Sequence, residues 1–207
     1  TLIASYMNVT GDVSLDGESL LSVPSATRTE LHRLEMTVGG TLTVDAAARI
    51  DASGKGYPGF GYDDYYGGPE FGYRKNRSCH AGVMSGGSAD CTYGRYEHAR
   101  FAGSGARYTH GGGAVSIAAG SLVLNGVVAA NGSIGNNDYA GGAGGSIHVE
   151  TVTLSGDGHF EAMGGRNGDN QAGDEASGGG RISVYATDWD GFLSKDRYFV
   201  QQGYGRA

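Results

Sequence analysis

The chain has 207 residues, enough for one domain with a hydrophobic core. Forty residues are glycine and only three are proline, which excludes collagen and proline-rich linkers, while 39% hydrophobic residues and 13 tyrosines argue against disorder. A formal net charge of −7 argues against a nucleic-acid partner, and no apolar run reaches the roughly 18 residues that a membrane-spanning helix needs.

The first predicted strands lie in residues 1–54. The run TLIASYMNV opens the chain with neither an initiator methionine nor a signal peptide, so we expect a mature or excised part of a longer product. GDVSLDGESLLS from Gly11 and GGTLTVDAAARIDASG from Gly39 follow. Apolar residues alternate in both, and Gly and Asp stand at the bends, where we expect glycine to supply positive φ.

Two later segments repeat each other. Residues 113–133, GAVSIAAGSLVLNGVVAANGS, align without a gap on residues 145–165, GSIHVETVTLSGDGHFEAMGG, which begin 32 positions later. The alignment places Leu122 on Leu154. Within the first segment, the Asn125-Gly126 pair predicts a turn between two strands.

The same pattern occurs elsewhere in the chain. Residues 39–54 match it with Leu42 equivalent to Leu122, residues from Gly11 form a weaker copy, and GGGRISVYATDW from Gly178 begins another. A unit of about 30 residues with short strands of period 2 predicts a solenoid. We therefore predict an all-β chain, a single parallel β-helix domain over residues 1–207 with about five coils stacked about 4.8 Å apart.

The segments GGGAVSI, GSLVLNGVVAANGS, GGAGGSIHV, LSGDGHFEAMGG and GGGRISVYATDW resemble the glycine-rich parallel β-helix modules of large secreted or surface proteins in protists and bacteria. The resemblance covers residues 39–189 and implies the fold. Such modules occur in adhesive, structural and carbohydrate-active chains alike, so the resemblance does not choose a function.

The chain departs from the plain repeat by a long insertion. Gly40 and Gly120 are equivalent positions 80 residues apart, where the repeat step is 32, so 48 extra residues lie within residues 55–111. A loop of this length in a compact domain is usually functional. We expect its tyrosines to contact a ligand or a second subunit, and the candidates are Tyr57, Tyr62, Tyr65, Tyr66, Tyr73, Tyr96 and Tyr108.

Two features point to an oxidising, extracellular or cell-surface location. Cys79 and Cys91 lie in the insertion, and their spacing with His80 does not match a zinc site, so we predict a disulfide. Asn-x-Ser/Thr sequons occur at Asn8, Asn76 and Asn131 and predict N-glycosylation if the chain is a eukaryotic secreted protein, with chance occurrence as the alternative.

Parallel β-helices often resemble polysaccharide lyases and hydrolases, so we also consider a catalytic role. The insertion holds groups that could act in such a reaction. For β-elimination the candidates are Tyr93, His98, Arg100 and His110, with His80 and Arg107 beside them. Hydrolysis would need paired carboxylates, for which Asp63, Asp64, Asp90 and Glu97 are available. No spacing in either set is diagnostic, so we predict no enzymatic activity and no cofactor.

Calcium is the alternative at GGRNGDNQAGDE, which carries Asp169, Asp174 and Glu175. Asn167 stands where the calcium-binding glycine/aspartate turn has a glycine, and the motif occurs once instead of in tandem. We therefore expect solvated surface charge and no metal.

A structural role agrees best with these observations. Five coils would span about 24 Å with open backbone edges at both ends, and the C-terminal GFLSKDRYFVQQGYGRA could lie across one end or reach into the next molecule. We predict an extracellular structural glycoprotein module that stacks head to tail with itself, into a filament or tandem surface array, with glycans as a second class of partner. The alternative is a polysaccharide-binding or polysaccharide lyase β-helix that uses the insertion as its site.

Overall fold

The computed structural model describes residues 1–27, 29–59, 78–82, 91–135, 140–168 and 177–203. Within these ranges the strands form two sheets, and every pairing between neighbouring strands of a sheet is parallel. The all-β prediction with parallel pairing is therefore confirmed. No helix in the described part of the chain is long and apolar enough to cross a membrane.

One sheet is built from short strands and the other mainly from long ones. The short-strand sheet has the order β1 (Leu2–Ile3), β4 (Leu20–Ser22), β6 (Arg49–Asp51), β8 (Val127–Ala129), β10 (His159–Glu161), β12 (Tyr198–Phe199). The long-strand sheet has the order β11 (Arg181–Asp188), β9 (Ser146–Ser155), β7 (Ala114–Leu124), β5 (Leu34–Val44), β2 (Tyr6–Val9), and β3 (Val13–Leu15) also pairs with β5.

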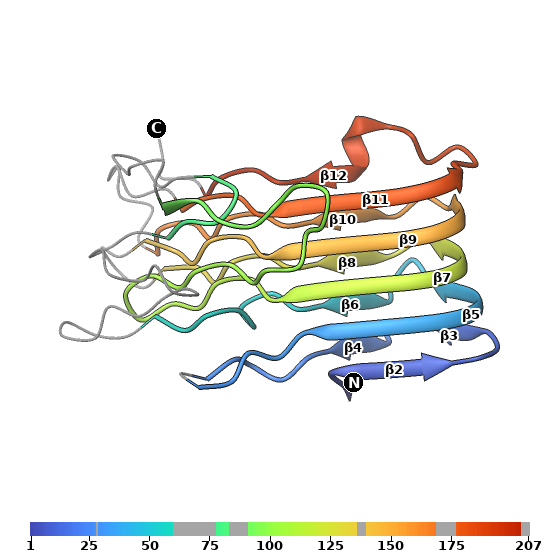
Figure 1. Cartoon of the computed structure of the whole chain (residues 1–207), viewed down its shortest axis with the longest axis horizontal. Coiled ribbons are helices and arrows are strands. Elements are labelled where there is room, and N and C mark those ends of the chain that lie inside the picture. The colour runs from blue at the N-terminus through green and yellow to red at the C-terminus, as the bar shows by residue number, and fades with distance from the viewer. Residues whose placement is uncertain (28, 60–77, 83–90, 136–139, 169–176, 204–207) are drawn as a thin grey trace.

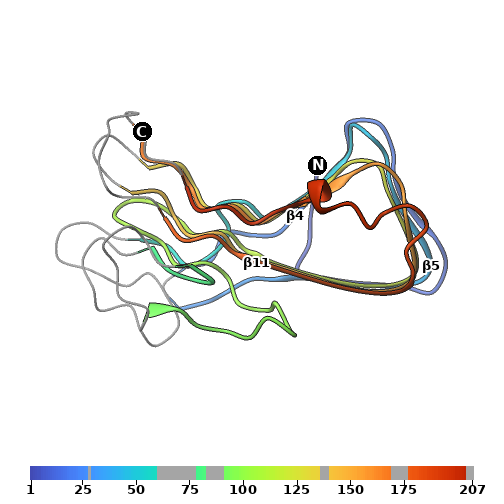
Figure 2. The same ribbon diagram turned by 90° about the horizontal axis from the view of Figure 1, so that it is seen from above.

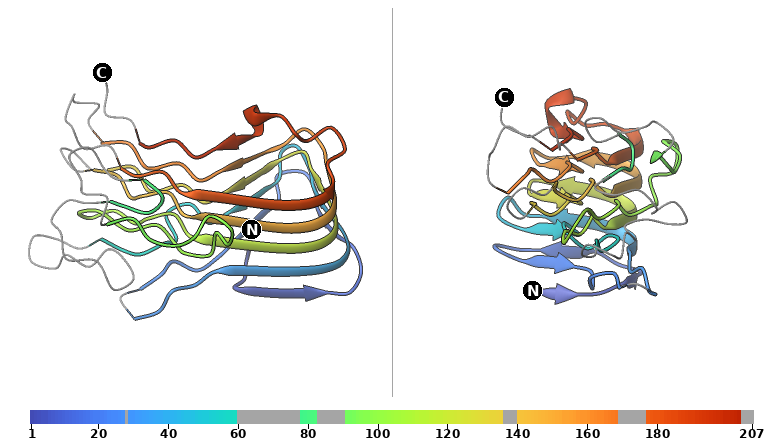
Figure 3. Two further views of the ribbon diagram at one scale, coloured as in Figure 1. Left: turned by 45° about the horizontal axis from the view of Figure 1, so that its top comes forward. Right: turned by 90° about the vertical axis from the view of Figure 1, so that its left-hand side faces the viewer.

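The chain passes back and forth between the two sheets, and from β4 to β11 each passage adds one strand to each sheet. Figure 1 shows the strands rising in chain order from β2 to β12, and Figure 3 shows the same layers in two further views. Viewed from above in Figure 2, successive passages lie over one another. The two sheets are far apart at the β5 side and close together towards the loops.

The strand register stacks equivalent apolar side chains into columns. Leu42 pairs with Leu122, and Leu122 pairs with Leu154, which confirms both alignments of the sequence repeats. All three leucines are fully buried. Alternate residues of a strand point to the same face of the sheet, and these leucines point to the face that forms the core. The short-strand sheet contributes an equivalent column, formed by Leu21, Ile50, Val128 and Phe160, and this column is fully buried as well.

Glycine is needed where the two sheets approach each other. Gly145 N donates a hydrogen bond of 2.7 Å to Ala130 O, and the equivalent pairs Gly113–Ala52 and Gly180–Ala162 have the same length. A Cβ on Gly145 would lie 1.9 Å from Gly113 O, so no side chain fits there. Each of the three bonds closes the base of one loop, and the largest of these loops, residues 53–112, contains the insertion.

The expectation that glycine supplies positive φ at the bends is therefore wrong at most described positions. Among the described glycines, positive φ occurs at Gly17, Gly54, Gly94, Gly156 and Gly191. Gly126 does lie at the predicted bend, but its φ is not positive, and a Cβ there would lie 2.2 Å from Ala48 O. Close approach of backbone to backbone, rather than turn conformation, accounts for these glycines.

The C-terminal segment completes the last level of the structure. Tyr198 and Phe199 form β12 and pair with β10, while Phe192 is fully buried against Phe160, at 5.7 Å between ring centroids. The short 3-10 helix η2 (Lys195–Arg197) stands above this end of the short-strand sheet (Figures 1 and 2). Up to Gly203, the segment thus adds a strand to the sheet.

Candidate functional site

The described parts of the insertion lie against later levels of the structure. Ala81 N donates to Gly179 O at 3.1 Å, and Gly178 N donates to Ser78 O at 3.0 Å. Farther along, the Tyr185 hydroxyl of β11 donates to Glu97 O at 2.8 Å. The insertion, which follows β6 in the sequence, therefore lies against β11, and also against β9, where Ser146 Oγ donates to Phe101 O at 2.6 Å.

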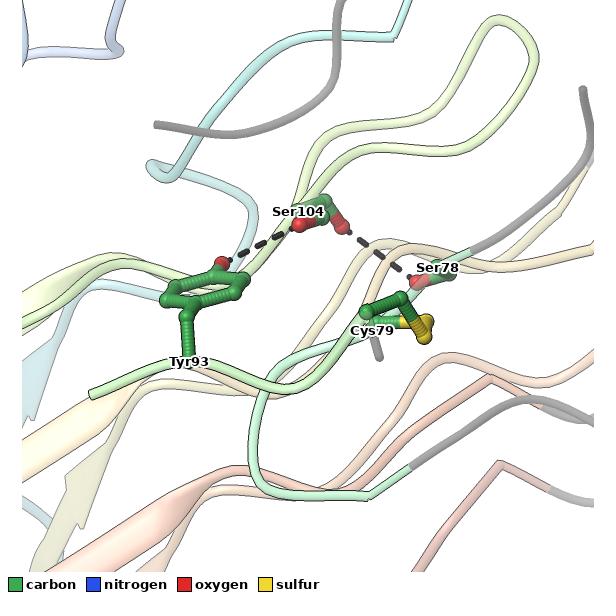
Figure 4. The surroundings of a disulfide bond; sticks show 5 residues. Ser78, Cys79, Tyr93 and Ser104 are labelled. Carbon is green, nitrogen blue, oxygen red and sulfur yellow. Dashed lines mark hydrogen bonds between the residues drawn. A yellow bond between two sulfur atoms is a disulfide. The ribbon is translucent and has the colours of Figure 1, made fainter. Parts of the chain in front are cut away.

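The predicted disulfide is confirmed. Cys79 and Cys91 are bonded, with their Cα atoms 5.8 Å apart, and Cys79 is buried. Figure 4 shows the surroundings, in which Ser104 accepts from Ser78 through its carbonyl and bonds the Tyr93 hydroxyl at 3.1 Å through its side chain. The disulfide thus joins two segments that both contact the base of the insertion.

His80 anchors this disulfide segment in the interior. Its ring is fully buried, its Nδ1 donates to Gly144 O at 2.8 Å, and it packs on Tyr93 with 4.9 Å between ring centroids. Burial is the largest cause that lowers the pKa of His80, to about 4, and the positive charge of Arg181 lowers it further. The imidazole is therefore neutral at neutral pH, and its role here is structural.

Acidification should weaken the fold through His80. Because its folded pKa of about 4 lies below the ordinary 6.5, the unfolded chain binds the proton more tightly, so stability is lost as pH falls from 6.5 towards 4. We expect a loss of about 2 kcal/mol at pH 5 from this group. Urea unfolding at pH 5, 6 and 7 measures it, and His80→Asn, which keeps a donor for Gly144 O, should flatten the dependence. An equal slope in the variant would contradict this assignment.

Tyr93 is held in the same interior. Its hydroxyl donates to Ala102 O at 2.6 Å, its carbonyl accepts from the Arg181 guanidinium, and burial raises the pKa of the phenol. A catalytic acid must exchange its proton with a substrate, so this environment does not support the lyase role suggested by the sequence.

The remaining lyase candidates have separate surroundings. His110 forms an isolated antiparallel β-bridge with Pro58. Burial is the largest cause that lowers the pKa of His110, and the positive charge of Lys55 lowers it further. Arg107 lies over the ring of Tyr108 at 5.6 Å, while Arg100 is exposed. Among the six candidates, His98 is the one that joins a cluster of ligand-type side chains on the sheet.

The outer face of the long-strand sheet presents this cluster. His98, His148 and Glu150 each offer a ligand atom, and these atoms lie within 4.8 Å of one another. His148 is the buried member: its Nδ1 lies 2.7 Å from Ser183 Oγ, and its Nε2 lies 2.9 Å from Glu150 Oε1. His98 comes from the insertion and places its ring 5.5 Å from that of His148.

Sequence reasoning missed two members of this cluster. His148 and Glu150 lie two positions apart in β9, so both side chains point to the same outer face. A His-x-Glu pair on a predicted strand was the available signal, and Ser183 follows from the register, because it pairs with His148.

A hollow of about 210 Å³ lies on the same sheet. Its lining includes Tyr6, Arg33, Glu35, Thr37, Ala99 and Arg100, so the insertion forms one wall and the strands form the floor. Arg33 and Glu35 lie 3.7 Å apart as an ion pair at its edge. The hollow combines two cations with aromatic and hydroxyl groups.

The other predicted sites are only partly described. Tyr96 and Tyr108 are exposed, and Tyr57 is half-buried with a pKa raised by burial. Asn8 is exposed, whereas the Asn131 side chain donates to Glu161 at 2.8 Å and accepts from Met163 N at 2.7 Å. The following lie outside the described residues: Tyr62, Asp63, Asp64, Tyr65, Tyr66, Tyr73, Asn76, Asp90, Asp169, Asp174 and Glu175.

Comparisons with known proteins leave the family open. No protein-family description matches the chain, and no curated protein and no solved structure matches it either.

Proposed function

We propose that the chain is a β-solenoid module of an extracellular structural assembly, in which copies stack end to end. The main support is the state of the last long strand. Ile182 and Val184 of β11 are half-buried, although Ile147 and Val149, with which they pair in β9, are fully buried. The last level thus leaves apolar groups that a further level would cover.

The opposite end has complementary unfilled positions. Met7 in β2 is half-buried where it pairs with Met36, and Leu2 in β1 is 52% exposed although it continues the buried column of Leu21. Met7 stands in the same column as Val184, four strands away. A second copy placed on the first would therefore continue columns of the same chemistry.

Among the described residues, no strand pairs with the outer edge of β11, so this edge offers backbone donors to such a copy. Arg181 N donates back to Gly145 O, and the direction alternates along a parallel strand, so the N–H groups of Ile182, Val184 and Ala186 point outward. When β2 and β3 of a second copy add to β11, its β1 falls at the level of β12. Each is a two-residue strand, and β1, whose Leu2 and Ile3 are exposed, is displaced in preference to β12, whose Tyr198 stacks on Phe160.

Extracellular location is supported by the disulfide, since such bonds persist in oxidising compartments. Asn8 supports a glycoprotein, because its exposed side chain points away from the core beside Thr37 and leaves the stacking surface clear.

A proline at the free edge tests the proposal. Ala186→Pro removes one outward N–H and no described hydrogen bond between strands, so the folded monomer should keep its melting temperature within a few degrees. In analytical ultracentrifugation over rising concentration, the wild-type chain should form end-to-end assemblies and the variant should stay smaller. Equal assembly by both chains would contradict the use of this edge.

Binding of an acidic glycan is the second candidate, and the hollow beside Arg33 and Arg100 favours it. Arg33→Ala should weaken binding of a uronic acid oligosaccharide about tenfold in calorimetric titration. Arg49→Ala is the matched control, because Arg49 is also 44% exposed and pairs with an acid two positions on, but lies on the other sheet. Equal binding by both variants would exclude the hollow.

A further inference from the structure

We propose that His98, His148 and Glu150 form a binding site for a divalent transition-metal ion of the zinc class. The proposal is independent of end-to-end stacking. It rests on three ligand atoms that lie within 4.8 Å of one another, contributed by two segments about fifty residues apart in the sequence.

His148 is the fixed ligand of this site. Its side chain is 2% exposed, and its Nδ1 is 2.7 Å from Ser183 Oγ, which in turn accepts from Ala99 N at 3.3 Å. A hydrogen bond to one ring nitrogen sets the orientation of the imidazole and directs the other, here Nε2, outward. Ser183 is thus a positioning residue for a metal ligand.

The other two ligands can adjust to an ion. Glu150 is 56% exposed, and its Oε1 already lies 2.9 Å from His148 Nε2, while His98 is exposed on the docked insertion. In a tetrahedral site with bonds of about 2.0–2.1 Å, ligand atoms lie roughly 3.3 Å apart. The observed separations bracket that value, so rotation of two exposed side chains completes the arrangement.

The donor set selects the class of ion. Two imidazoles and one carboxylate are the ligands of open zinc sites, in which a fourth position holds water or another molecule. Calcium prefers six to eight oxygen ligands and magnesium an octahedron of oxygens, and neither requirement is met by two nitrogens. A bound ion would fasten the insertion to β9, because His98 belongs to the former and His148 to the latter.

Calorimetric titration of the whole chain with Zn²⁺ tests the site, and Co²⁺ absorption reports its geometry. The wild-type chain should bind a single ion, and the Co²⁺ complex should show the intense visible bands of a four-coordinate site. His98→Ala removes an exposed ligand without opening the core and should weaken binding by about tenfold or more. Glu150→Gln should do the same.

His159→Ala is the matched control. His159 and Glu161 form the same His-x-Glu pair at 2.8 Å on β10, but they are not part of the three-ligand cluster. This variant should bind Zn²⁺ as the wild-type chain does. The proposal is overturned if the wild-type chain binds no ion at micromolar concentration, or if His98→Ala binds as tightly as His159→Ala.

Discussion

Gly145→Ala should lower the free energy of unfolding by about 3 kcal/mol or more, as measured by urea denaturation. The added Cβ would lie 1.9 Å from Gly113 O and 2.6 Å from Gly112 C, and both are backbone atoms that cannot rotate away. Relief requires that β7 and β9 separate at the base of their loops, where Gly145 also donates to Ala130 O.

Gly11→Ala provides the control for this prediction. A Cβ on Gly11 meets nothing within 4 Å, and its φ is not in the positive range, so the substitution should be close to neutral. The contrast separates close packing from the general effect of glycine on the entropy of the unfolded chain. Similar losses in the two variants would show that the close backbone approach between neighbouring levels is not what requires glycine at position 145.

Phe160→Ala should lower the free energy of unfolding by about 3–5 kcal/mol, because it leaves a large cavity in the core. Phe160 is fully buried, stacks on Tyr198 with 5.7 Å between ring centroids, and meets Phe192 edge-on. These three rings join β10 to the last level, so the variant should also release the segment around Phe192. Hydrogen exchange of residues 189–199 measures that release.

Val152→Ala is the control for the core prediction. Val152 lies in β9, the strand before β10, but is 58% exposed, so its truncation should cost less than about 0.5 kcal/mol. If Phe160→Ala left the exchange of the last level unchanged, the aromatic contacts would not be what holds that level.

The repeat predicted much of the fold because both of its signals, the alternation of apolar residues and the constant step, can be read directly from the sequence. Alternating apolar residues and a step of 32 residues were enough to place Leu122 opposite Leu154. The role of the glycines was not predictable in the same way. Gly126 needs room for Ala48 O, an atom from the preceding level, and a sequence pattern shows the turn but not that neighbour.

The candidate site was predicted only in part, for a related reason. The sequence places His98, His80 and Tyr93 in one insertion, but the fold separates their roles. His80 and Tyr93 turn inward to hold the disulfide segment, whereas His98 meets His148 on the sheet. That meeting depends on how a long insertion docks across several levels, and no periodicity encodes the docking.

Electron cryomicroscopy of concentrated or native material tests end-to-end stacking most directly. The proposal predicts a filament in which each chain adds about 24 Å along the axis and the strand spacing of about 4.8 Å continues through every junction between β11 and β2. Isolated particles at every concentration, or an assembly that joins copies side by side and leaves the edge of β11 in solvent, would contradict it.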